Sequence, residues 1–207
     1  MTLFLDSINR PGAVDNIVKA AIAHLWFETL HPFEDGNGRV GRALIDLIVA
    51  RDAGKTGRLF RISQRLLDVQ GEYYDQLASA QHGDLDITAW IIWFIEQFHI
   101  ACSQAAAIID LSLEKGRFWA NHASQFLTER QRKVVNLLLD AGSGGVEGGM
   151  STKKYQRIAR TSRATASREL LSLEKYGLLA VRGAGPGTRY HIALPGWHPQ
   201  NTANSED

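Results

Sequence analysis

The sequence predicts a mainly α-helical protein in which a helical bundle is followed by a small α+β domain. Up to about residue 120, apolar residues recur every three or four positions over several segments, as they do on one face of a helix. Further along, residues 178–181 and 188–192 are short apolar or alternating segments separated by glycines, a pattern typical of two strands joined by a turn. The net charge also changes sign between these two parts of the chain.

Composition favours two separate domains. The 207 residues are 44% hydrophobic, which is enough to bury one sizeable core or two smaller ones. Residues 1–125 hold 11 Lys and Arg against 15 Asp and Glu, whereas residues 126–196 hold 12 against 5. We therefore expect an acidic domain over 1–122, a basic domain over 123–196 and a polar tail over 197–207, with different partners for the two domains.

The single cysteine, Cys102, excludes a disulfide within the chain and suggests no cysteine-based zinc site. The first residues lack a basic region followed by an apolar run, and no apolar stretch in the sequence approaches membrane-spanning length. We therefore expect a soluble protein without membrane contact, in a reducing compartment such as the cytoplasm.

Two helices are expected around a glycine-rich loop in the first domain. Apolar residues from Val14 onward follow a helical period up to His31, and the period resumes at Arg39 and continues to Asp52. Gly54 is a natural end for the second of these helices. The loop between them therefore leads into the N-terminus of a helix.

Two further helices complete the predicted bundle. Ser63 can cap a helix over residues 64–81, in which Gly71 is a weak point. Asp86 or Thr88 can cap a long helix that is apolar on nearly all sides, as expected of a buried helix. We interpret the tryptophans of this helix as core rather than as a ligand-binding stripe.

The segment from His31 to Arg42 combines one imidazole, two carboxylates, three glycines, an asparagine and two arginines. Glycine and asparagine over residues 36–38 favour a turn, and the helix that follows offers unpaired N–H groups and a positive dipole end to an anion. Arg39 and Arg42 share one face of this helix and can reach neighbouring phosphates. This is the composition of a polyphosphate site.

Three other side chains of the segment have plausible tasks. Asp35 is a hard oxygen ligand suited to Mg²⁺, His31 is a general base near neutral pH, and Phe33 is expected to anchor the loop on the core. The alternative is an ordinary surface turn followed by a solvated helix face. A plain turn, however, does not require a histidine, an aspartate and two arginines together.

This segment resembles the signature of the Fic family, His-Pro-Phe-x-Asp/Glu-Gly-Asn-Gly-Arg-x-x-Arg, at every specified position. The resemblance implies a Fic-type helical bundle over about residues 10–110 and transfer of a nucleoside monophosphate, usually AMP from ATP, to a protein hydroxyl. It implies that His31 deprotonates the target Ser, Thr or Tyr and that Asp35 holds Mg²⁺. The nucleotide-binding residues that it implies are Gly36, Asn37 and Gly38 at the α-phosphate, Arg39 and Arg42 at the outer phosphates, and the intervening Val40 and Gly41.

Residues outside the signature leave alternatives open. Tyr74, and after it Tyr73, lie in a segment similar to the Fic segment that closes over adenine, but a buried tyrosine pair is the other interpretation. We interpret His24 as structural, because a histidine seven residues before His31 does not have the sequence spacing of a metal-ligand pair on a helix. Glu28 lies three residues before His31 and either orients it or is a solvated helix charge.

The sequence pattern of the second domain predicts a helix, a turn, another helix and two strands. Residues 128–131 form a capping box, Ser151 starts a helix over 153–160, and a short turn leads to a further helix that ends at Gly177. A glycine-rich tip joins the two predicted strands into a wing. This order resembles the winged helix-turn-helix family over roughly residues 126–194.

The winged-helix resemblance implies that the second helix and the wing contact DNA. The residues expected to do so are Lys153 and Lys154 on the first helix, Arg163, Thr165 and Arg168 on the second, and Arg189 on the wing. The same fold also serves dimerisation or target docking, so a homodimer is an alternative reading of this module.

Two parts that usually accompany the Fic signature are not found before residue 13. They are a β-hairpin flap that aligns the target chain and an inhibitory helix with the pattern Ser/Thr-x-x-x-Glu-Gly/Asn. We expect an N-terminally shortened form in which Arg42 lacks an inhibitory partner within the chain, and in which target alignment and helix packing are impaired.

The sequence therefore favours an enzyme, an ATP- and Mg²⁺-dependent protein adenylyltransferase with an appended winged-helix module. The second hypothesis is a DNA-binding transcription regulator whose Fic-like domain only senses nucleotide. Intact His31 argues against it, because phosphate binding needs the loop and arginines but no base. Removal of AMP from a modified protein and an inert fragment are the remaining alternatives.

Overall fold

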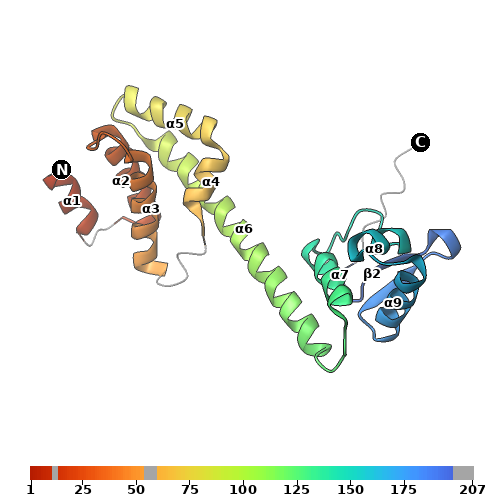
Figure 1. The fold of residues 1–207 in the computed structure, drawn as a ribbon. Coiled ribbons are helices and arrows are strands. Elements are labelled where there is room, and N and C mark those ends of the chain that lie inside the picture. The colour runs from red at the N-terminus through yellow and green to blue at the C-terminus, as the bar shows by residue number, and fades with distance from the viewer. Residues whose placement is uncertain (11–13, 54–59, 198–207) are drawn as a thin grey trace. The chain divides into compact units, whose positions relative to one another are not determined.

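The computed structural model describes residues 1–10, 14–53 and 60–197, and it divides into two compact units, Met1–Asp110 and Leu111–Asp207 (Figure 1). The described chain is mainly helical, with one small antiparallel sheet. The expected end of a helix at Gly54 falls outside the described residues.

The first unit is a helical bundle. Its elements are α1 (Thr2–Asn9), α2 (Asn16–Leu30), α3 (Asn37–Ala53), α4 (Ile62–Asp68), α5 (Gln70–His82) and the first part of α6 (Thr88–Asn121). The core includes Phe4, Ala21, Phe27, Ile45, Ile48, Leu66, Trp90 and Phe94. Trp90 is 1% exposed and donates from Nε1 to the Ala21 carbonyl at 2.9 Å, so the interpretation of the tryptophans as core is confirmed.

The prediction of one helix over residues 64–81 is wrong, because the segment forms α4 and α5. Val69, at φ −112° and ψ 35°, ends the first and begins the second. Ser63 lies inside α4 instead of capping it, and its hydroxyl is 2.8 Å from Asp46 Oδ2. The residue before α4 is Arg61, which is left-handed and makes no side-chain cap.

Helix α6 begins as predicted, since the Thr88 N–H donates to Asp86 Oδ1 at 2.9 Å. Contrary to expectation, this helix is long and apolar enough to meet the length and composition criteria for a membrane span. Long core helices of soluble proteins meet the same criteria, and Trp90, Trp93 and Phe94 lie in the core of the first unit. Length and composition therefore do not assign α6 to a membrane.

The second unit contains the last part of α6, three helices and a hairpin. The elements are α7 (Glu129–Asp140), α8 (Thr152–Ala159), α9 (Arg163–Lys175), β1 (Leu179–Arg182), the 3₁₀ turn Gly185–Gly187 and β2 (Arg189–Ile192). β1 and β2 pair antiparallel, with Leu179 opposite Ile192. The predicted order of helix, turn, helix and hairpin is therefore present, with the 3₁₀ turn at its tip.

The boundary between the units falls at residue 110 rather than 122, because the end of α6 contributes Phe118 to the second core. Trp197, which we placed in a polar tail, is 5% exposed in the same core and donates to Glu114 Oε2 at 2.8 Å. Both residues are large and apolar, so their burial with the second unit follows from the hydrophobic effect.

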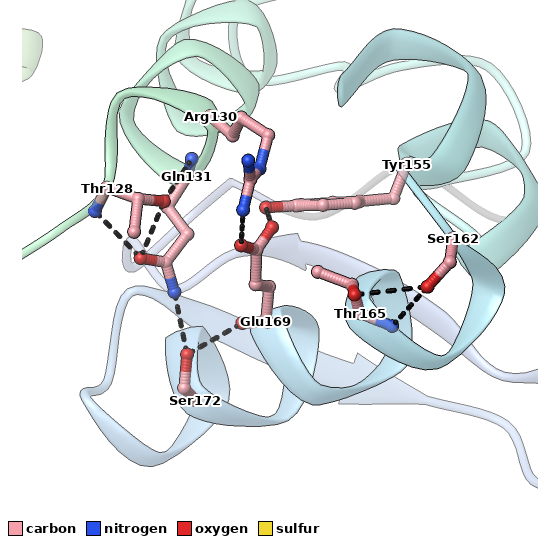
Figure 2. A network of polar contacts seen from close by, with 8 residues as sticks. All are labelled: Thr128, Arg130, Gln131, Tyr155, Ser162, Thr165, Glu169 and Ser172. Atoms are coloured by element: carbon pink, nitrogen blue, oxygen red, sulfur yellow. Dashed lines mark hydrogen bonds and ion pairs between the residues drawn. The ribbon is translucent and has the colours of Figure 1, made fainter. Parts of the chain in front are cut away.

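Polar contacts join α7, α8 and α9 (Figure 2). Glu169 of α9 accepts from Arg130 of α7 at 2.8 Å and from the Tyr155 hydroxyl of α8 at 2.7 Å. Burial opposes ionisation of Glu169, but the hydrogen bonds from Arg130 and Tyr155 outweigh it and lower the pKa of the carboxyl. We call these three residues the helix clamp.

Candidate functional site

His31 ends α2 in a strained backbone conformation. It is left-handed, at φ 42° and ψ 56°, and its N–H donates to the Phe27 carbonyl at 3.0 Å. A non-glycine residue rarely adopts this region, and the following Pro32 restricts it further. Such strain is concentrated at functional sites, where the surrounding structure holds it in place. The His31 side chain is exposed, so it is open to a substrate.

Asn37 holds the loop after His31. Its Oδ1 accepts from the Phe33 N–H at 3.0 Å and its Nδ2 donates to the Phe33 carbonyl at 2.5 Å. Asn37 is 3% exposed, whereas Phe33 is 48% exposed and has its ring centroid 6.2 Å from that of the buried Phe27. Phe33 therefore packs against a core residue as expected but stays half exposed, and the Asn37 carboxamide also fastens the loop.

Helix α3 starts at Asn37, two residues before the predicted Arg39. Gly36, at φ 88°, makes the turn, and its carbonyl accepts from the Arg39 and Val40 N–H groups. The two arginines fold back beside the loop glycines. A Cβ at Gly36 would lie 3.4 Å from Arg39 Nη2, and a Cβ at Gly38 would lie 3.3 Å from Arg42 Nη1.

These positions put two guanidinium groups around the positive end of the α3 dipole. The dipole, the unpaired N–H groups of the first turn and the two cations all favour an anion at one place. Such an arrangement is chemically suited to a ligand with several phosphates.

Asp35 pairs with Arg39 across 3.2 Å, but both side chains are largely exposed, at 93% and 75%. An exposed pair of this kind contributes little stability, so Asp35 is available to a ligand. Within the described chain, no three His, Cys, Asp or Glu side chains form a group that could hold a metal ion. A single carboxylate still fits Mg²⁺, which proteins commonly bind through one or two carboxylates together with substrate phosphates.

The structure separates the two tyrosines. Tyr73 is 2% exposed, and its hydroxyl lies 2.8 Å from His24 Nε2 in the core. Of the two interpretations that the sequence left open for Tyr73, the structure therefore favours a buried tyrosine. Tyr74 is 50% exposed, with its ring centroid 5.0 Å from that of Tyr73. Tyr74 alone offers a ring face on which a base can stack.

His24 is fully buried, and burial lowers its pKa to about 4, so the imidazole is neutral at physiological pH. This supports its interpretation as structural. Gly41 also faces inward, against His24 and Glu28, whereas Val40 is 38% exposed. Of these two intervening residues of the signature, only Val40 faces solvent.

One contact with the Arg42 backbone, made from outside the loop, was not predicted from the sequence. The Ser63 hydroxyl of α4 is 3.3 Å from the Arg42 carbonyl as well as 2.8 Å from Asp46 Oδ2. This contact joins α4 to the first half of α3. It depends on the packing of distant segments, which no local pattern indicates.

A polar groove of about 520 Å³ lies in the second unit. It is lined by Ser151, Thr152, Lys153, Gln156, Arg163, Gly185, Pro186, Thr188 and Arg189. Three of the predicted DNA contacts, Lys153, Arg163 and Arg189, therefore meet in one groove between α8, α9 and the hairpin tip.

The other predicted contacts are placed differently. Ser162 caps α9 by accepting from the Thr165 N–H at 3.2 Å, and its hydroxyl lies 3.0 Å from the Thr165 hydroxyl (Figure 2). Lys154 donates to the carbonyls of Glu147 and Gly149. Arg168 is exposed on α9 but does not line the groove.

Known proteins are similar to a part of this chain. The protein adenylyltransferase fic-1 of Caenorhabditis briggsae is 41% identical over 73 residues, which is 35% of this chain and 13% of that protein. The protein adenylyltransferase Fic of Nematostella vectensis is 37% identical over 75 residues, or 36% and 16%. A probable protein adenylyltransferase of Aquifex aeolicus is 49% identical over 45 residues, or 22% and 14%.

These matches span only about one seventh of the relatives' own length. A crystal structure of a Fic family protein from Desulfovibrio desulfuricans G20 aligns with a TM-score of 0.48 and 21% identity, over 99% of this chain and 54% of that one. Residues 1–49, which include the whole loop and most of α3, match the model of the Fic/DOC family.

Proposed function

We propose that this protein is an adenylyltransferase that moves AMP from ATP to a Ser, Thr or Tyr hydroxyl of a target protein. The observation that carries the proposal is the geometry of one loop. The loop runs from the exposed His31 at the end of α2 to the N-terminus of α3, where the guanidinium groups of Arg39 and Arg42 lie beside Gly36 and Gly38. The names of the similar proteins, which are protein adenylyltransferases, support the same activity.

In the proposed reaction, the target hydroxyl oxygen attacks the α-phosphorus of ATP, and the bond to the β-phosphate breaks to release pyrophosphate. His31 accepts the hydroxyl proton as general base. Arg39, Arg42 and the N–H groups at the start of α3 stabilise the negative charge on the phosphates. Asp35 would hold Mg²⁺, which when bound neutralises charge on the phosphate oxygens. The exposed ring of Tyr74 is the proposed stacking surface for adenine.

The intact mass of the purified protein after incubation with ATP and Mg²⁺ tests this activity. We expect a mass increase of one AMP on the parent, or on an added protein substrate, and none with His31→Ala. His99→Ala, which changes an exposed histidine of α6, serves as the matched control and should transfer AMP like the parent. Equal transfer by His31→Ala and the parent would refute the catalytic assignment.

The same samples separate the alternatives. A nucleotide sensor would bind ATP in both parent and His31→Ala and form no adduct in either. Net loss of AMP from an already modified protein, dependent on His31, would point to removal rather than addition. Because ATP is the proposed substrate and the lone Cys102 requires no oxidising compartment, we place the reaction in the cytoplasm.

A second function, DNA binding by the second unit, is favoured by the groove that brings Lys153, Arg163 and Arg189 together. Charges that neutralise phosphates make binding steeply dependent on salt. We expect Arg163→Ala to weaken binding to a fluorescent duplex and to reduce the salt slope by about 1. Arg117→Ala, an exposed arginine of α6 outside the groove, is the control. Equal affinities and slopes for the two variants would exclude the groove as the binding surface.

A further inference from the structure

Asp35 and Arg39 form an ion pair across the turn that leads into α3. Arg39 Nη2 donates a hydrogen bond to Asp35 Oδ2 at 3.2 Å. The same nitrogen lies beside the loop backbone, since a Cβ at Gly36 would be 3.4 Å from it. We call the pair of Asp35 and Arg39 the loop latch.

The second arginine of the loop has no such partner. Arg42 belongs to none of the three ion pairs of the described chain. Its Nη1 atom lies beside Gly38, 3.3 Å from the position that a Cβ would take there. Of the two guanidinium groups beside the loop glycines, only that of Arg39 is therefore paired with a carboxylate within the described residues.

Both partners of the loop latch have a second task in the proposed reaction. Arg39 is proposed to hold phosphate oxygens, and Asp35 is proposed to hold Mg²⁺. A phosphate oxygen that accepts from Arg39 Nη2 competes with Asp35 Oδ2, and its negative charge repels the carboxylate. Asp35 also lies two residues before the start of α3, whose positive dipole end attracts the same phosphates. The latch and the phosphates therefore compete for one positive region.

We propose that the loop latch makes the site selective for ATP that carries Mg²⁺ over metal-free ATP. The Asp35 carboxylate repels the phosphates of metal-free ATP and withholds Arg39 from them. When Asp35 holds Mg²⁺, its charge is compensated and Arg39 is released to the phosphates. This inference rests on the proposed function, because it requires ATP to bind at the loop.

The exposure of the latch limits the size of the effect. Both side chains are largely exposed, and exposed ion pairs alter an equilibrium constant by no more than about fivefold. The latch therefore adjusts the preference between two forms of ATP and does not close the site.

Calorimetric titration with ATP in the presence of EDTA tests the proposal. Asp35→Asn keeps the shape of the side chain but removes the ionic partner of Arg39. We expect it to bind metal-free ATP about two- to fivefold more tightly than the parent does. Glu34→Gln is the matched control, because Glu34 is an exposed neighbour that belongs to no ion pair of the described chain. This control measures the effect of losing one negative charge alone, and its gain in affinity should be smaller.

A double-mutant cycle separates the latch from general repulsion. In an Arg39→Ala background, Asp35→Asn should increase the affinity for metal-free ATP no more than Glu34→Gln does, because the pair is already broken. In an Arg42→Ala background, Asp35→Asn should keep its full effect. Retention of the full effect without Arg39 would overturn the proposal, as would equal gains for Asp35→Asn and Glu34→Gln in the parent.

The titrations need no turnover, so they distinguish the latch from the transfer reaction. A parent that binds ATP but forms no AMP adduct would refute the proposed transfer and leave the cycle decisive for the latch. Failure of the parent and all variants to bind ATP, with or without Mg²⁺, would refute both.

Discussion

At the scale of the residue, Asn37 shows why the loop requires an amide. The Phe33 N–H needs an acceptor and the Phe33 carbonyl needs a donor, and the Asn37 carboxamide supplies both from one buried side chain. An aspartate has the same shape but only acceptors when ionised. The asparagine of the signature is therefore explained by the backbone groups that it satisfies.

Asn37→Asp should consequently destabilise the first unit by about 1–3 kcal/mol, because the Phe33 carbonyl loses its donor and faces a negative charge. It should also weaken ATP binding, since the loop is no longer fixed. Asn16→Asp is a close control, because Asn16 and Asn37 are the first residues of α2 and α3. A negative charge at either position therefore interacts with a helix dipole in a similar way. Urea denaturation and calorimetric titration with ATP measure both effects, and equal losses in the two variants would contradict this role.

At the scale of the element, caps that lie in the local sequence could be predicted. The capping box of Thr128 and Gln131 is complete, and the hydroxyl of Ser151 accepts from the Lys154 N–H at 3.2 Å, because each cap involves residues three positions apart. The break at Val69 and the early start of α3 could not be predicted in this way. The early start of α3 rests on the turn at Gly36 and on the bonds between Asn37 and Phe33, which the apolar period of the sequence does not indicate.

The candidate site was predictable in composition but not in orientation. The signature identified the loop residues, whereas the burial of Tyr73 and the inward position of Gly41 depend on which helix face meets a partner. Adjacent residues of a helix point about 100° apart, so a sequence that names Tyr73 and Tyr74 together does not say which one is exposed.

At the scale of the whole molecule, each of the two units has its own hydrophobic core. Trp90 and Phe94 of α6 belong to the first core and Phe118 of the same helix to the second. The helix clamp of Arg130, Tyr155 and Glu169 lies wholly in the second unit (Figure 2). A change in the clamp should therefore affect one unfolding transition and leave the loop of the first unit intact.

Glu169→Gln tests this independence. Loss of the charged contact to Arg130 should cost the second unit about 1–3 kcal/mol, and each kcal/mol lowers the melting temperature of a domain of this size by roughly 4–8 °C. Because the folded-state pKa of Glu169 is lowered, its contribution is complete above the unfolded value of 4.5 and is lost as the pH falls through the folded-state value. The difference between parent and variant should therefore shrink below about pH 4.5.

Calorimetry of the two transitions provides the measurement. The transition that Asn37→Asp shifts belongs to the first unit, and Glu169→Gln should leave that one unchanged. Glu174→Gln, an exposed change on the same helix α9, should move neither transition. A single transition shifted by both Asn37→Asp and Glu169→Gln would show that the two cores unfold together, and it would make the stability of the loop depend on the second unit.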